Sequence, residues 1–205
     1  ATTMVFKEGS KGNGAAMRVA PIGLLYWYDD SRIIQGAYKA SIITHSNPLA
    51  IDGAVSIALS IGMILRGEDI YTIPERILDH MNTDMMRKKI KDVASLFQRE
   101  KTDREEVINL LGNGVLTDQS VPTALYVFLR YGSDFIKAIN YSVSLGGDTD
   151  TISAMTGALC GALLSYEALP SECIKALESA EIILNNADRL YDLSRKLLKY
   201  NKNLP

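Results

Sequence analysis

The sequence predicts an all-α fold, a compact orthogonal bundle of several helices, and three observations lead to this prediction. Apolar residues recur at spacings of three and four along almost the whole chain, whereas alternation with a period of two is hard to find. Pro48, Pro74, Pro122 and Pro170 fall near the expected first turns of helices, where the missing N–H of proline costs nothing. A length of 205 residues suffices for one hydrophobic core, so we expect a single domain over residues 1–205.

The amino-terminal half contains five predicted helices. The first follows a glycine-rich loop and contains Pro21, which should kink it. The second follows Asp29 and Asp30, a pair that is typical of a solvated turn and N-cap. The fifth lies in the most charged segment, residues 84–106, and is typical of a solvated helix at the rim of a fold. These five helices are predicted over residues 14–28, 31–44, 48–66, 74–80 and 84–100.

Four further helices are predicted in the carboxyl-terminal half. One of them has small residues that allow very close packing, so we expect it to pass through the centre of the bundle with its acidic end at a cavity. The last helix carries leucines at mixed helical spacings and ends in lysines that complement the helix dipole, which is typical of a scaffold helix. The small residues are Ala154, Gly157, Ala158 and Gly161, and the four helices are predicted over residues 121–131, 133–144, 150–166 and 170–200.

Composition and charge exclude several classes of protein. The chain has 22 basic and 24 acidic residues and a net charge of -2, so no global positive field attracts nucleic acid. No apolar run is judged long enough to span a membrane and no signal peptide is visible, so we expect a cytoplasmic protein with neither nucleic acid nor membrane as a partner. Cys160 and Cys173 lack metal or disulfide spacing and are interpreted as small core residues.

The segment 144–151, Ser-Leu-Gly-Gly-Asp-Thr-Asp-Thr, is the most informative motif. Asp148, Asp150 and Thr151 are placed at a helix start, where they can point in one direction, and hard oxygen ligands select Mg²⁺, Mn²⁺ or Ca²⁺. The alternative is that these residues only cap the helix. A bound cation would relieve the repulsion between the two carboxylates. Magnesium prefers six oxygens, so further acids are expected, and the pair at 29 and 30 is interpreted as a turn instead.

The segment 6–18 is a glycine-rich loop that runs directly into a predicted helix. It lacks the spacing of a Walker A or a Rossmann turn, but a diphosphate could bind its backbone amides and the positive helix end. Phe6 would offer a face on which a base can stack. The alternative, equally weighted, is a flexible turn with Asn13 as the N-cap.

Two weaker signals lie elsewhere in the chain. His45 lies in a short connection between two helices, where it could contact a ligand or cap the carbonyls of the preceding helix. The segments 112–114 and 120–124 form another glycine turn before a helix and could line the same cleft.

Five motifs occur in one order, and together they resemble the ADP-ribosylglycohydrolase family of dinitrogenase-reductase-activating glycohydrolases and ADP-ribosyl hydrolases. The segments 9–19 and 105–130 are most similar to the branch with serine-ADP-ribose and poly(ADP-ribose) hydrolases. The motifs are Gly-Asn-Gly-Ala-Ala-Met-Arg-Val-Ala at 12–20, Thr-His at 44–45, Gly-Asn-Gly at 112–114, Ser-Val-Pro-Thr-Ala at 120–124 and Leu-Gly-Gly-Asp-Thr-Asp-Thr at 145–151.

The resemblance implies an all-α hydrolase that holds two Mg²⁺ ions, with Mn²⁺ as a substitute, at the bottom of an ADP-ribose cleft. It cleaves the bond between ribose C1 and the modified group, so ADP-ribose and ADP-ribosylated proteins would be its partners. The metal ligands implied are Asp148, Asp150 and Thr151. The ADP-ribose contacts implied are Phe6, Gly9, Ser10, Lys11, Gly12 and Asn13, with His45 on the far wall.

The family also carries a catalytic glutamate and a Thr-Asp-Asp motif that have no counterpart in this sequence. No catalytic residue is therefore identified, and the acid is expected in a missing amino-terminal segment, with a complementary amino-terminal fragment as a partner. The leading hypothesis is Mg²⁺-dependent hydrolysis of ADP-ribosyl adducts on proteins, with poly(ADP-ribose) or O-acetyl-ADP-ribose as further substrates. The rival hypothesis is a non-catalytic ADP-ribose-binding module or an incomplete fragment.

Overall fold

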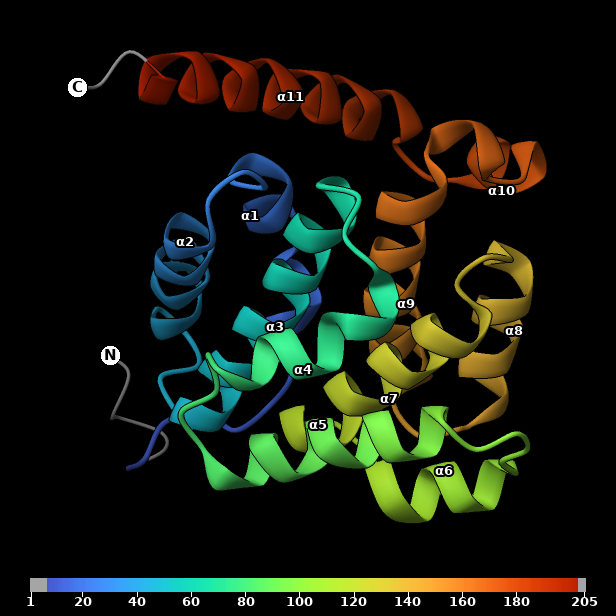
Figure 1. Ribbon diagram of the computed structural model, residues 1–205. Helices are drawn as coiled ribbons and strands as arrows, with labels where there is room; N and C mark the ends of the chain where they lie inside the picture. The colour runs from blue at the N-terminus through green and yellow to red at the C-terminus, as the bar shows by residue number, and fades with distance from the viewer. Residues whose placement is uncertain (1–6, 203–205) are drawn as a thin grey trace.

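The computed structural model describes residues 7–202, and within them every regular element is a helix, as predicted (Figure 1). One isolated antiparallel bridge, between Gly12 and Leu116, joins two loops. The α-helices are α1 (Ala20–Leu25), α2 (Asp30–Ile42), α3 (Pro48–Leu65), α4 (Ile73–Leu78), α5 (Asp84–Phe97), α6 (Arg104–Leu111), α7 (Thr117–Tyr131), α8 (Phe135–Ser144), α9 (Thr149–Leu164), α10 (Ser171–Ala176) and α11 (Ala180–Lys202). Three short 3-10 helices are η1 (Ala16–Arg18), η2 (Ile70–Thr72) and η3 (Tyr166–Ala168).

Helix α3 is the core of the described bundle and contacts α1, α2, α7 and α9. Asn47 caps it by accepting a hydrogen bond from the Leu49 N–H (3.0 Å), and Pro48 occupies its first turn. With a mean hydropathy of 1.9, this helix is long and apolar enough to cross a membrane by length and composition. The prediction that no apolar run of the sequence is long enough to span a membrane was therefore wrong. Because 83% of the helix is buried inside the protein, it has the character of a core helix.

The buried Asp52 of α3 ties this core helix to the start of α5. Its carboxylate accepts hydrogen bonds from the backbone N–H of Asn82 (3.0 Å) and from the N–H (2.8 Å) and hydroxyl (2.6 Å) of Thr83. Thr83 is the N-cap of α5, so one fully buried carboxylate is satisfied by a turn and a helix end. This acid therefore has a structural role.

The charged segment forms two helices where one was predicted. Helix α5 buries Met86, Ile90, Val93 and Leu96, and it ends at Phe97. Asp103 then caps α6 by accepting a hydrogen bond from the Glu106 N–H (2.7 Å). The high charge of residues 84–106 obscured this second helix, which buries Val107 and Leu111 fully and packs Ile108 and Leu110 against the core in part.

The first predicted helix is shorter in the structure than expected and the sixth is longer, and each contains a proline. Pro21 lies in the first turn of α1 and separates it from η1, so residues 14–28 do not form one kinked helix. Helix α7 begins at Thr117, and Pro122 lies inside it instead of in its first turn. The Thr117 N–H is satisfied by the carbonyl of Lys11 (3.0 Å), a tertiary partner that allows the helix to begin four residues early.

The last predicted helix is broken, and the small-residue helix lies at the surface of the described bundle. Ser179, with a φ of 58°, separates α10 from α11, which lies across one end of the bundle (Figure 1). Helix α9 buries Ile152 and Met155, whereas Ala154 is exposed and no described atom lies within 4 Å of a Cβ built on Gly161. Helix α9 therefore does not pass through the centre, and of the two cysteines only Cys160 is buried.

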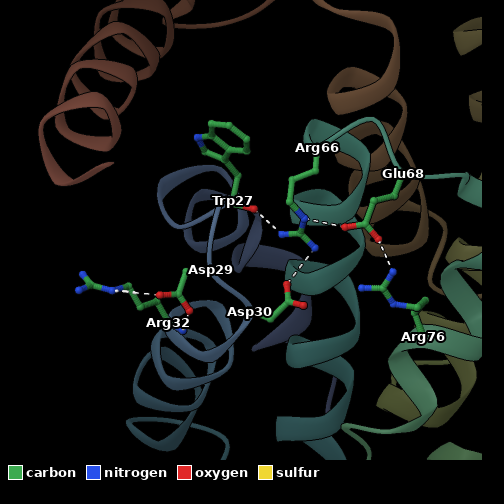
Figure 2. Close-up of polar contacts among 7 residues, drawn as sticks. All are labelled: Trp27, Asp29, Asp30, Arg32, Arg66, Glu68 and Arg76. Atoms are coloured by element: carbon green, nitrogen blue, oxygen red, sulfur yellow. Dashed lines mark hydrogen bonds and ion pairs between the residues drawn. The ribbon is translucent and has the colours of Figure 1, made fainter. Parts of the chain in front are cut away.

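A network of charged residues anchors the connection between α1 and α2 to the end of α3 (Figure 2). Arg66 donates to the carbonyl of Trp27 and pairs with Asp30 (2.9 Å) and with Glu68 (2.6 Å), which also pairs with Arg76 (2.7 Å). This fixes the start of α2, whose other end leads to the candidate ligand residue at position 45.

Asp29 confirms the N-cap prediction for the acidic pair. Its carboxylate accepts a hydrogen bond from the Arg32 N–H (3.1 Å), and it also forms an ion pair with the Arg32 side chain (3.4 Å; Figure 2). Both acids at 29 and 30 therefore have structural roles, Asp29 as the cap of α2 and Asp30 as the partner of Arg66.

Candidate functional site

The glycine-rich loop is held against the turn before α7 by a short backbone ladder. The Asn13 N–H donates to the carbonyl of Val115 (3.0 Å), and the Thr117 N–H donates to that of Lys11 (3.0 Å). The Thr117 hydroxyl donates to the carbonyl of Gly12 (2.7 Å). The loop is thus held in place before any ligand binds, which reduces the ordering cost of binding.

Gly9 is required at its position by both conformation and space. Its φ is 76°, and a Cβ there would lie 2.9 Å from the carbonyl carbon of Ser46. The adjacent carbonyl of Glu8 accepts a hydrogen bond from the amide of Asn47 (3.0 Å), the residue that caps α3. The core helix therefore fixes the loop.

A groove of about 640 Å³ runs along this loop. The volume lies within the range of small-molecule sites. Lys11 is exposed and its ammonium lies 3.8 Å from the Glu8 carboxylate, a loose surface pair that leaves the charge available to an anion. The groove is lined by Lys7, Glu8, Gly9, Ser10, Lys11, Gly12, Val115 and Leu116. Phe6, also predicted to contact ligand, lies outside the described residues.

Asn13 connects the loop to the acidic motif. Its side-chain amide nitrogen donates to the Ser120 hydroxyl (3.0 Å) and to the Asp148 carboxylate (2.5 Å), and the residue is 7% exposed. The alternative that Asn13 caps the following helix does not hold, because η1 begins after Ala15 with no side-chain cap. The Asn13 amide instead links the glycine-rich loop to α7 and to the start of α9.

Two glycines deliver Asp148 to the start of α9. Gly146 and Gly147 have φ values of 67° and 70°, and a Cβ on Gly147 would collide with the backbone of Asn113. This close approach lets the Asp148 N–H donate to the Asn113 carbonyl (2.7 Å). The sequence pattern of two glycines before the acids thus has a direct steric cause.

The Asp148 carboxylate is not used as a helix cap. It occupies the N-cap position of α9 without a capping hydrogen bond, and instead it accepts from Asn13 and from the hydroxyl of Thr151 (3.2 Å). The Asp150 carboxylate accepts from the Thr151 N–H (2.9 Å). This hydrogen bond, and next a side-chain hydrogen bond with Asp148, hold the pKa of Asp150 below its usual range. Two carboxylates and a hydroxyl therefore converge.

This donor set fits one side of a magnesium or manganese site. All three groups are hard oxygens, the kind of ligand that these ions prefer. Asp148 and Thr151 are partly or fully buried and oriented, whereas Asp150 is exposed. Within residues 7–202 no cluster of three or more His, Cys, Asp or Glu side chains has metal-binding geometry. The described residues can thus supply two carboxylates, and water would fill other positions.

His45 lies against the glycine-rich loop. A Cβ on Gly14 would lie 2.7 Å from the imidazole Cε1, and one on Gly12 would lie 3.4 Å from Nε2. The imidazole Nδ1 hydrogen-bonds with the Thr44 hydroxyl (2.8 Å), to which Arg18 also donates. Burial, followed by the charge of Arg18, lowers the pKa of His45 and favours the neutral ring. His45 therefore supports the loop from the side of α2.

The two glycine-turn motifs at 112–114 and 120–124 do not themselves line the groove. Val115 and Leu116, which lie between the motifs, line it, whereas Ser120 and Thr123 are fully buried. Thr117 also belongs to the site, because it holds the loop in place, and it was not predicted from the sequence. A hydroxyl at every third position, 117, 120 and 123, was the available signal, because that spacing places the three groups on one helix face.

Comparisons with known proteins agree with the sequence resemblance. A family model described as ADP-ribosylglycohydrolase matches residues 2–199. The chain is 32% identical over 219 residues to the ADP-ribosylhydrolase ARH3 of Homo sapiens, and the match covers 91% of this chain and 60% of that protein. It is 34% identical over 192 residues to ARH3 of Xenopus tropicalis, covering 80% of this chain and 55% of that protein.

A solved structure described as "ADP-ribosylglycohydrolase-related protein complex" is similar with a TM-score of 0.76 and 26% identity. The match covers 91% of this chain and 62% of the solved one. The chain thus spans about 60% of the length of the curated relatives that it matches.

Proposed function

The chain belongs to the ADP-ribosylglycohydrolase family, and from this premise we propose that it takes part in the hydrolysis of ADP-ribosyl adducts on proteins. One observation carries the proposal. The glycine-rich loop and the acidic end of α9 meet directly, through the 2.5 Å hydrogen bond from Asn13 to Asp148. A site for an anionic ligand and a site for a cation therefore share one edge.

The groove supports ADP-ribose as the ligand. Gly9 to Gly12 would hold the diphosphate along the loop, with Lys11 supplying a positive charge at its rim. The ribose beyond the diphosphate would then lie at Asp148 and Thr151, next to Asn13. We propose protein-linked ADP-ribose as the substrate class, with poly(ADP-ribose) and O-acetyl-ADP-ribose as further members that carry the same group.

We propose that Asp148, Asp150 and Thr151 hold a divalent cation, Mg²⁺ or Mn²⁺, and that the complete family site holds two. A bound cation of this type lowers the pKa of a coordinated water and polarises oxygen atoms of the substrate. The residues of this chain orient the carboxylates: Asn13 and Thr151 each donate to Asp148, and Thr151 donates to Asp150. We further propose that hydrolysis needs additional acids from a polypeptide segment in the same chain or in a complementary fragment.

A second function is favoured by one observation. Because the described residues contain no cluster of three or more metal-binding side chains, the chain could act as an ADP-ribose-binding module without catalysis. Replacing Asp148 and Asp150 with alanine separates the two functions. A binding module should keep its affinity for ADP-ribose, whereas a hydrolase site should lose the Mg²⁺-dependent part.

Calorimetric titration of ADP-ribose with and without Mg²⁺, combined with release of ADP-ribose from serine- and arginine-modified peptides, tests the proposal. Mg²⁺-dependent binding with release supports a hydrolase that completes its own site. Binding without release supports a module or a chain that needs further acids. If ADP-ribose does not bind under either condition, the proposed function is wrong.

A further inference from the structure

Helix α7 presents a face of three buried hydroxyls to the site. Thr117, Ser120 and Thr123 are each 0% exposed and follow one another at intervals of three, on the same side of the helix. Thr117 donates to the carbonyl of Gly12 (2.7 Å) and Thr123 to that of Gly112 (2.5 Å). The face therefore holds both glycine loops of the site in place.

Ser120 differs from Thr117 and Thr123 because its hydroxyl oxygen accepts a hydrogen bond from a side chain of the loop, whereas the two threonines donate to loop carbonyls. Its hydroxyl donates to the carbonyl of Leu116 (3.1 Å), one turn earlier in α7. With its hydrogen used, the oxygen can only accept, and it accepts from the Asn13 amide nitrogen (3.0 Å). The amide group therefore turns its NH₂ toward Ser120.

The second hydrogen of that NH₂ is then directed at Asp148. A primary amide carries two N–H groups, and those of Asn13 go to the Ser120 hydroxyl and to the Asp148 carboxylate (2.5 Å). The flipped amide would place its carbonyl oxygen against the Asp148 carboxylate, a repulsive contact, and Ser120 could meet that oxygen favourably only by giving up its bond to the Leu116 carbonyl. The acceptor at Ser120 thus selects the orientation in which Asn13 donates to Asp148.

We propose that Ser120 is a positioning residue for the candidate cation site, acting through Asn13 on the Asp148 carboxylate. This inference rests on the proposed function and deepens it, because it assigns a role to the motif at 120–124. Ser120 is fully buried and does not line the groove, so its role would be exerted through Asn13 and not by direct contact with a ligand there. Groups that orient a metal ligand typically change metal affinity by about 10- to 100-fold when they are removed.

The chain offers a matched control for Ser120. Ser60 of α3 is also 0% exposed, and its hydroxyl donates to the carbonyl four residues earlier, that of Ser56 (2.7 Å). Replacing either serine with alanine removes one buried hydroxyl that donates to its own helix. The comparison isolates the contact with Asn13.

Mn²⁺ and Mg²⁺ titrations of Ser120→Ala and Ser60→Ala test the inference. Ser120→Ala should weaken cation binding by about tenfold, whereas Ser60→Ala should stay within about twofold of the unchanged chain. In ¹H–¹⁵N NMR spectra without any cation, the side-chain amide pair of Asn13 should shift in Ser120→Ala and remain in place in Ser60→Ala. A merely structural loss would not move this signal selectively.

The outcomes distinguish the inference from the function on which it rests. Unchanged cation affinity or an unmoved Asn13 amide pair in Ser120→Ala overturns the positioning role, even if the chain binds ADP-ribose. If the unchanged chain does not bind ADP-ribose with or without a cation, the proposed function fails. If it binds ADP-ribose but no cation, the positioning role is overturned and the binding function stands. A tenfold loss confined to Ser120→Ala supports both.

Discussion

Asn13 and Asp148 lie 135 residues apart in the sequence, and their amide nitrogen and carboxylate oxygen are 2.5 Å apart in the structure. The contact joins a loop suited to a diphosphate to a helix end suited to a cation. It also shows that neither group is a simple cap, since η1 and α9 both begin without a side-chain capping bond.

Asn13→Asp should destabilise the chain through this contact. The substitution replaces a donor with a carboxylate next to that of Asp148, and we expect a loss of about 1–3 kcal/mol in the free energy of unfolding at pH 7. Millimolar Mg²⁺ should restore part of the loss, because a cation between the carboxylates offsets their repulsion. Urea unfolding with and without Mg²⁺ measures both effects.

Asn13→Ala is the control for charge. It removes the same hydrogen bonds without adding a carboxylate, so Mg²⁺ should restore none of its deficit. Equal responses of the two variants to Mg²⁺ would show that the carboxylate of Asp148 is not part of a cation site.

Gly147→Ala should be more costly than the same substitution at another glycine of similar conformation. Gly147 (φ 70°) and Gly67 (φ 71°) share a left-handed backbone, but a Cβ on Gly147 meets the backbone of Asn113, whereas nothing lies within 4 Å of one on Gly67. We expect Gly67→Ala to cost about 1 kcal/mol for the conformation alone and Gly147→Ala at least about 1–2 kcal/mol more. Similar urea midpoints for the two variants would contradict the close approach at Asn113.

The elements best predicted from the sequence were those with local signals at both ends. Helix α3 was predicted over residues 48–66 and spans Pro48–Leu65, because its cap, its proline and its apolar length are all visible in the sequence. The approximate place of α9 was also predicted, from two glycines and an acidic first turn. Its position at the surface was not, because small residues indicate close packing without saying whether a partner is present.

The parts that could not be predicted depend on tertiary partners. Helix α7 begins at Thr117 because the N–H of this residue donates to the carbonyl of Lys11. Lys11 lies 106 residues earlier in the chain, so no local sequence signal could indicate this partner. The loop and the acids were each proposed as site residues, but nothing local indicates that Asn13 reaches Asp148 or that Ser120 orients it. Spacing identified the groups, and only the fold shows which of them meet.

Stability should fall at acidic pH through His45. Burial and the charge of Arg18 lower the folded-state pKa of His45 below its ordinary value of 6.5. As pH falls through 6.5 the unfolded chain therefore binds a proton that the folded chain resists, so this contribution is complete above pH 6.5 and is lost below it. The urea midpoint should drop between pH 7.5 and 5.5, and it should drop less in His45→Gln.

His80→Gln is the matched control for the pH experiment. It removes the chain's other histidine and leaves the contacts of His45 with Thr44 and Gly14 intact. This variant should keep the pH dependence of the unchanged chain. If His45→Gln also keeps it, the imidazole does not lie in the partly buried position beside Arg18.

If the glycine-rich loop and the acidic end of α9 form one site, paramagnetic NMR should detect a cation and ADP-ribose bound side by side there. Mn²⁺ added below stoichiometry should broaden the amide signals of Gly147, Thr151 and Asn13 first and leave that of Gly67 sharp. Unlabelled ADP-ribose with Mg²⁺ should then shift the signals of Gly9 to Asn13 in the same spectra. Broadening elsewhere, or ADP-ribose shifts that avoid this loop, would show that the loop and the acidic end of α9 do not form one site.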